Sequence, residues 1–205
     1  MQQLSEQWQQ QAQQWGADRQ ACQQVFNLLQ SSYSGAQRFY HGIGHIRQML
    51  ELAQQQRAAI ADWPAFFFAI WFHDLIQQNK GNNEELSAAL AREYLQPLAV
   101  PEAVIAKAEQ LILATRTHQY QADSDVQLFM DIDLSILAAE PAAYRAYASQ
   151  CRKEYFLPDF IYRFGRRRFL HELSEREWIF SSPYFRQHSE QLARANIKWE
   201  LEEWL

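Results

Sequence analysis

Glycine and proline are scarce in this chain, with six of each among 205 residues. Because tight turns between strands depend on these residues, their scarcity argues against a many-stranded sheet. The two cysteines, Cys22 and Cys151, are too few and too far apart for a disulfide framework or a cysteine-based metal site. The longest apolar run, around residues 66–72, is far shorter than the roughly 20 residues that a membrane span requires.

An excess of positive charge is also missing, since 19 Lys and Arg oppose 24 Asp and Glu for a net charge of −5. A nucleic-acid-binding protein would need a basic face to neutralise phosphates. The opening residues lack the charged segment followed by an apolar segment that marks a secretory signal. We therefore expect a cytoplasmic, soluble protein with neither a nucleic-acid nor a membrane partner. A homo-oligomer stays open, because Trp199 and Trp204 could pack internally or at a subunit contact.

Apolar residues recur instead at the helical spacing of i, i+3, i+4 and i+7. This period predicts helices at residues 2–15, 19–32, 43–56, 63–77, 83–97, 101–116, 124–138, 141–152, 159–174 and 185–203. Asp62 is placed to cap the fourth of these helices, which carries Pro64 in its first turn. No repeat, linker or change in composition divides the chain. The sequence predicts one all-α domain over residues 1–205, a bundle of about 8–10 helices.

Residues 61–76, ADWPAFFFAIWFHDLI, are apolar almost all the way round, which is typical of a helix at the centre of a bundle. The segment nevertheless ends in His73 and Asp74. An unpaired buried carboxylate costs several kcal/mol, and the negative end of a helix disfavours Asp by about 0.3–1 kcal/mol more. A bound cation would reverse both effects, although Asp74 could instead reach solvent beyond the last turn.

Two other predicted helices carry similar residues in apolar surroundings. His41 and His45 precede or open the helix at residues 43–56, and Asp131 and Asp133 lie within FMDIDLSIL at residues 129–137. One imidazole from the first helix, the pair at residues 73–74 and one carboxylate from the last make a mixed nitrogen and oxygen set. Such a set suits a divalent ion of Mn, Fe, Co, Ni, Zn or Mg better than a thiolate-preferring metal.

At these residues the chain resembles the HD superfamily of metal-dependent phosphohydrolases, which are all-α proteins. The resemblance is carried, in order, by YHGIGHI at 40–46, WFHDLI at 71–76, NNEELSA at 82–88 and FMDIDLSIL at 129–137. Together these motifs resemble a group of predicted HD-type metal-dependent hydrolases of bacteria, and the similarity runs over most of the chain. The resemblance implies that His45, rather than His41, is the first metal ligand, and that His73 and Asp74 are the HD pair.

For the last ligand the resemblance favours Asp133, which follows an apolar residue and precedes the rest of an apolar helix. Asp131, two residues earlier, would point about 200° away around the helix. The residue that is not a ligand is expected to be a hydrogen-bonded support or a solvent-facing acid.

The reaction implied is hydrolysis of a phosphate ester in a nucleotide or another small phosphorylated metabolite, with a metal-activated water as nucleophile. Asp74 would ligate the metal and hold or deprotonate that water. Arg116 and His118 are the candidates for phosphate contacts, while Arg38 and Lys80 are weaker ones. Glu84 could act as an acid or base, or could simply be a first-turn carboxylate that the helix dipole favours.

Two other classes of function stay open. A regulatory module could bind a metal or nucleotide without turnover, since ligands alone do not establish catalysis. An HD-type diiron oxygenase needs extra histidines between the HD pair and the last aspartate, and only His118 lies in that interval.

The remaining features of interest have structural explanations. The arginine run RFGRRRFL at residues 163–170 is expected to form a solvated helix face, paired with acids such as Glu172 and Glu175. Tyr144 and Tyr147 share a helix face and are expected to pack with their hydroxyls at the surface.

Overall fold

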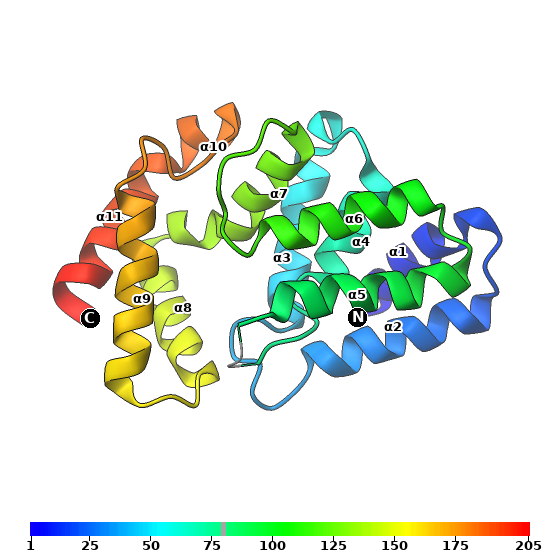
Figure 1. Ribbon diagram of the computed structural model, residues 1–205, viewed down its shortest axis with the longest axis horizontal. Helices are drawn as coiled ribbons and strands as arrows, with labels where there is room; N and C mark the ends of the chain where they lie inside the picture. The colour runs from blue at the N-terminus through cyan, green and yellow to red at the C-terminus, as the bar shows by residue number, and fades with distance from the viewer. Residues whose placement is uncertain (79–80) are drawn as a thin grey trace. The chain divides into compact units, whose positions relative to one another are not determined.

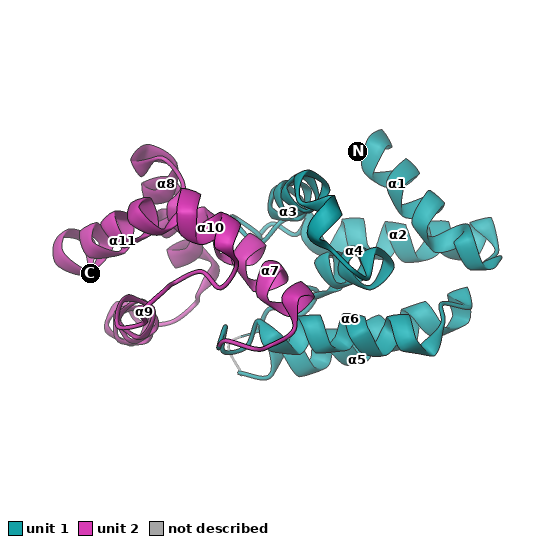
Figure 2. Cartoon of the chain, turned by 90° about the horizontal axis from the view of Figure 1, so that it is seen from above, with its two compact units in different colours: residues 1–119 teal, residues 120–205 magenta. Residues whose placement is uncertain are grey.

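The computed structural model describes residues 1–78 and 81–205, and throughout these residues the secondary structure is helical, with no strand. The chain forms two compact units, unit 1 at Met1–Gln119 and unit 2 at Tyr120–Leu205 (Figures 1 and 2). The all-α prediction is confirmed. The expectation of a single domain over residues 1–205 stays a prediction. Lys80, the weak phosphate-binding candidate, lies outside the described residues.

Unit 1 contains six α-helices and three short 3₁₀ turns within the described residues. In chain order these are α1 (Gln2–Ala12), η1 (Gln13–Trp15), α2 (Arg19–Tyr33), α3 (Ile43–Gln55), η2 (Arg57–Ala59), α4 (Trp63–Phe72), α5 (Asn83–Leu95), η3 (Gln96–Leu98) and α6 (Glu102–Ala114).

Unit 2 contains five α-helices, one 3₁₀ segment and a closing π-helical turn. These are α7 (Ser124–Asp133), η4 (Leu134–Ala138), α8 (Pro141–Glu154), α9 (Asp159–Ser174), α10 (Pro183–His188), α11 (Glu190–Trp199) and η5 (Glu200–Trp204).

Helix α4 forms the centre of unit 1, as its all-round apolar sequence predicts. Every residue from Ala65 to Phe72 is buried, and the helix packs against α3, α5 and α6. Trp8 of α1 lies edge-on to Trp71, with ring centroids 5.9 Å apart. The Asp62 side chain accepts a hydrogen bond from the Ala65 amide, so the predicted cap is present. This packing fixes the end of α4, where His73 and Asp74 follow.

Two helix boundaries differ from the prediction. Helix α4 ends at Phe72 rather than near residue 77, because the chain turns there and the Ile76 amide donates to the hydroxyl of Ser87 on α5. The segment at 185–203 is divided at Ser189 into α10 and α11. At this break the Glu190 carboxylate accepts hydrogen bonds from the amides of Ile179 and Phe180, which draws the first turn of α11 onto the preceding loop.

Unit 2 holds a buried ion pair that the sequence did not predict. Arg166 of α9 donates from Nε and Nη2 to the two carboxylate oxygens of Glu200, at 2.8 and 3.1 Å. Tyr144 donates its hydroxyl to Glu200 at 2.5 Å, and Arg166 also donates to the hydroxyl of Tyr147 at 3.2 Å. The expectation that these two tyrosine hydroxyls lie at the surface is therefore wrong. Arg168 does form the expected pair with Glu172 along the exposed face of α9.

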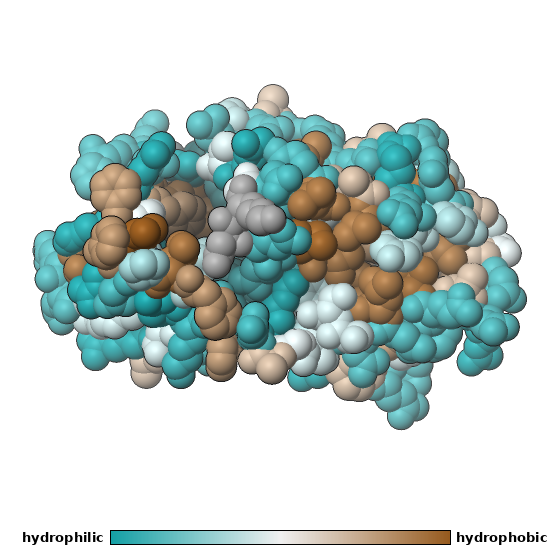
Figure 3. Space-filling model, turned by 60° about the horizontal axis from the view of Figure 1, so that its bottom comes forward, coloured by the Kyte–Doolittle hydropathy of each residue, from teal (hydrophilic) through white to brown (hydrophobic). Residues whose placement is uncertain are grey.

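On the face drawn in Figure 3, hydrophilic side chains surround patches of apolar ones. The most exposed apolar side chains of unit 2 are Phe160 and Phe164, one turn apart on α9, at 73% and 74% exposure. Among the described residues, none of the helices combines the length and the apolar character needed to cross a membrane.

Candidate metal centre

Three of the predicted ligands come together within unit 1. His45 lies in the first turn of α3, while His73 and Asp74 follow the last residue of α4. One ligand atom from each of the three residues lies within 4.8 Å of the other two. The apolar sequence of α4 buries its end in the core, and the amphipathic α3 packs against it. Two elements therefore supply two imidazoles and a carboxylate at one point.

Hydrogen bonding orients His73. Its Nδ1 lies 3.0 Å from the carbonyl oxygen of Ile70, one turn back in α4. A carbonyl can only accept, so Nδ1 carries the proton and Nε2 presents a lone pair. A histidine that ligates a metal commonly donates its other ring N–H to a carbonyl in this way. The bond leaves Nε2 of His73 as the nitrogen that faces His45 and Asp74.

The distances between the three ligand atoms fit one ion. Nε2 of His45 and Nε2 of His73 are 3.3 Å apart, and Oδ2 of Asp74 lies 3.2 Å from the His73 nitrogen and 3.9 Å from the His45 nitrogen. A point equidistant from all three atoms lies about 2.0 Å from each. Nitrogen and oxygen ligands bind Zn²⁺ at roughly 2.0–2.2 Å. The triangle therefore has the size of a coordination site for a first-row divalent ion.

The three ligands differ in exposure. The side chains of His45 and His73 are 3% and 1% exposed, whereas that of Asp74 is 29% exposed. The imidazoles form the inner wall of the site and the carboxylate faces its open side. This arrangement explains how an aspartate is tolerated beside an apolar helix end, because it has both nitrogen neighbours and access to water.

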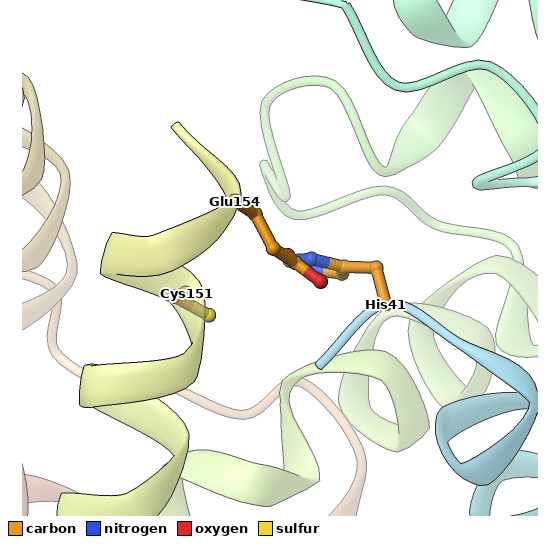
Figure 4. Close-up of side chains that lie close together, drawn as sticks. All are labelled: His41, Cys151 and Glu154. Carbon is orange, nitrogen blue, oxygen red and sulfur yellow. The ribbon is translucent and has the colours of Figure 1, made fainter. Parts of the chain in front are cut away.

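His41 lies in the segment leading into α3 (Figure 4) and is not part of this three-residue cluster. The amide nitrogen of Gln77 donates to Nδ1 of His41 at 3.2 Å, and the His41 ring lies edge-on to that of Tyr40. The Gln77 contact joins the segment before α3 to the segment after α4.

The two aspartates of the last motif belong to α7 in unit 2. Asp131 is 1% exposed, and its carboxylate accepts from the amides of Ser181 and Ser182 at 2.7 and 2.6 Å. Burial raises its pKa. Asp131 thus supports the start of α10. Asp133 is half-buried at the end of α7. Its role as the last metal ligand stays a prediction.

The candidates for contacts with substrate lie on α5 and after α6. Glu84 is half-buried in the first turn of α5, where the helix dipole favours a carboxylate. Arg116 is exposed and its guanidinium is bound by the carboxylate of Glu85, a partner that the sequence analysis did not single out. His118 is half-buried and adopts a φ of 47°, in the left-handed region that few residues other than glycine adopt.

Comparison with known proteins gave no match: no family model, no curated protein and no solved structure is similar to this chain.

Proposed function

We propose that this chain is a metal-dependent phosphohydrolase of the HD type, which hydrolyses a phosphate ester in a nucleotide or another small phosphorylated metabolite. The observation that carries the proposal is the cluster of His45, His73 and Asp74, whose ligand atoms are spaced for a single ion. The resemblance of the four sequence motifs to HD phosphohydrolases supports the reaction class.

The two histidines have the role of fixed ligands. Both are buried, and the Nδ1 proton of His73 is held by the Ile70 carbonyl, so Nε2 is the nitrogen that faces the other two ligands. A divalent cation held here would act as a Lewis acid toward the phosphoryl group and would lower the pKa of a water molecule toward neutrality. Mn, Co, Ni, Zn, Fe and Mg all accept such a ligand set to differing degrees.

Asp74 has a second role in the proposal, because it is the most exposed of the three ligands. Its carboxylate can contact water on the open side of the site while Oδ2 faces the two imidazoles. We assign to it the orientation of the attacking water and the acceptance of its proton. Arg116 would contact a substrate phosphate only after releasing Glu85, and because this ion pair is exposed the exchange costs little.

The test is phosphate release over a panel of nucleotides and phosphorylated metabolites. The protein is stripped with a chelator and reloaded with each of the six metals in turn. Asp74→Asn is assayed beside Glu51→Gln, which changes an exposed carboxylate on α3, the helix that carries His45. We expect turnover that requires metal, is lost in Asp74→Asn and is retained in Glu51→Gln.

Two results would contradict the proposal. Metal binding without turnover on any substrate would favour the regulatory module, in which a nucleotide binds without being hydrolysed. Two irons per chain, with an absorbance change when the reduced protein meets oxygen, would favour the oxygenase.

A further inference from the structure

The two segments that carry the ligands are joined by one arginine. Arg38, in the segment between α2 and α3, donates from Nη1 to the carbonyl of His41 at 3.1 Å and from Nη2 to the carbonyl of Leu75 at 2.8 Å. The Leu75 carbonyl is one residue beyond Asp74, and the His41 carbonyl immediately precedes the N-cap of α3. The Arg38 guanidinium therefore bonds the backbone on both sides of the site, at the start of α3 and in the turn after α4, beside the contact of Gln77 with His41.

Tyr33, the last residue of α2, holds Arg38 in this position. The Arg38 guanidinium carbon lies 5.3 Å from the centroid of the Tyr33 ring, and the Tyr33 hydroxyl donates to the carbonyl of Trp71 at 2.9 Å. Tyr33 is only 1% exposed. Because the tyrosine is buried and bonded to α4, it gives Arg38 a platform that is fixed relative to His73 and Asp74.

The backbone at Gly42 packs closely against the backbone at Tyr33 and Arg38. A Cβ atom on Gly42 would lie 3.1 Å from the carbonyl oxygen of Tyr33 and 3.2 Å from that of Arg38. Gly42 is the N-cap of α3, and its own carbonyl accepts from the amide of His45 at 3.0 Å. The close packing at Gly42 and the bond from Arg38 to the His41 carbonyl therefore both fix the start of α3, whose first turn carries His45.

We infer that Arg38 is the positioning residue of the metal centre, which sets the separation of His45 from His73 and Asp74 and thereby the affinity for the metal. Arg38 is a weaker candidate for a phosphate contact by sequence, and its guanidinium is instead directed at two backbone carbonyls. Outer partners of metal ligands commonly change metal affinity by about 10–100-fold. The inference rests on the metal centre of the proposed function and adds to it a residue outside the ligand set.

Arg38→Lys tests the inference, because lysine keeps the charge but replaces the planar fork with one ammonium group, which does not reproduce both bonds. Arg57→Lys is the matched control. Arg57 also lies over an aromatic ring, at 4.8 Å from the centroid of Trp63, and donates to a backbone carbonyl, that of Ile60, yet it contacts neither ligand segment. Co²⁺ is the probe, since its visible absorption reports the geometry of its ligands.

The readouts are the Co²⁺ dissociation constant and the Co²⁺ spectrum at saturation, beside the unfolding midpoint of each metal-free variant. We expect Arg38→Lys to bind Co²⁺ about 10–100-fold more weakly, with an altered spectrum, and Arg57→Lys to match the unaltered chain. Tyr33→Phe, which removes the bond to Trp71 and keeps the aromatic ring under Arg38, should weaken binding less. It provides the test if Arg38→Lys fails to fold.

The failures are distinguishable. Unchanged affinity and spectrum in Arg38→Lys, or losses no greater than those in Arg57→Lys, overturn the positioning role and leave the centre intact. If Arg38→Lys does not fold, an unchanged Co²⁺ affinity in Tyr33→Phe overturns it as well. Absence of Co²⁺ binding by the unaltered chain overturns the metal centre, and the positioning role with it.

Discussion

Glu200→Gln is expected to destabilise unit 2 strongly. The Glu200 side chain is fully buried and accepts three hydrogen bonds, two from Arg166 and one from Tyr144. Glutamine keeps the shape but removes the charge, and its amide nitrogen is a donor that faces donors. Arg166, only 10% exposed, then becomes a buried cation without a counterion.

Breaking one side of a buried ion pair costs about 3–5 kcal/mol of unfolding free energy. With a urea dependence of roughly 3 kcal/mol/M, the unfolding midpoint should fall by about 1–2 M. The assay is urea unfolding followed by circular dichroism, with hydrogen exchange of peptides from α8, α9 and α11 to locate the change.

The control is Glu172→Gln, which alters the exposed ion pair of Glu172 with Arg168 on α9, the helix that also carries Arg166. Because both side chains are more than half exposed, this midpoint should stay close to that of the unaltered chain. If Glu200→Gln lowered the midpoint no more than Glu172→Gln, the buried pair would not contribute as the structure indicates.

Four further predictions concern other buried groups. The Tyr162 hydroxyl is buried without a hydrogen-bond partner, so Tyr162→Phe should be neutral or stabilising by up to about 1 kcal/mol, whereas Tyr144→Phe should cost about 1.5–3 kcal/mol in urea unfolding. Burial raises the pKa of both tyrosines, so as the pH rises their hydroxyls ionise first in the unfolded chain. The free energy of unfolding should therefore fall above about pH 10, and it should fall less in Tyr162→Phe than in the unaltered chain. An equal fall in the two proteins would contradict this assignment. Asp131→Asn leaves one backbone amide without its acceptor and should cost about 1–3 kcal/mol, and an unchanged midpoint would rule out its support of α10. Gly42→Ala should destabilise unit 1 by about 1–3 kcal/mol and weaken Co²⁺ binding, because the added Cβ would crowd two carbonyl oxygens. An unchanged unfolding midpoint together with an unchanged Co²⁺ affinity would show that this crowding does not matter.

The helices and three of the proposed ligands could be predicted because their signals are local. Helical spacing of apolar residues identified the segments, and the uncompensated charge of Asp74 beside the apolar α4 marked a site without any knowledge of the fold. His73 was found by the same reasoning, whereas His41 and His45 were both candidates and only the resemblance favoured His45. In the structure these residues lie together at the end of α4.

Contacts between distant segments could not be predicted, since nothing local marks them. Glu200 is 34 residues from Arg166, and the serine amides that bind Asp131 are about fifty residues away from it. In the sequence, Arg166 is one of several similar arginines, and only packing distinguishes it from Arg168. Arg38 was a weaker candidate for a phosphate contact because it lies next to a ligand-bearing segment, while its two carbonyl acceptors are created by the turn after α4 and the start of α3.

The central claim is that His45, His73 and Asp74 hold an ion on which phosphate release depends. The most direct measurement is a titration of the stripped protein with Mn²⁺, in which bound metal and phosphate release from the best substrate are followed together. We predict that both rise in parallel and saturate together near one ion per chain, and that neither rises in Asp74→Asn. Phosphate release that is independent of bound metal, or metal binding that Asp74→Asn leaves unchanged, would contradict the account.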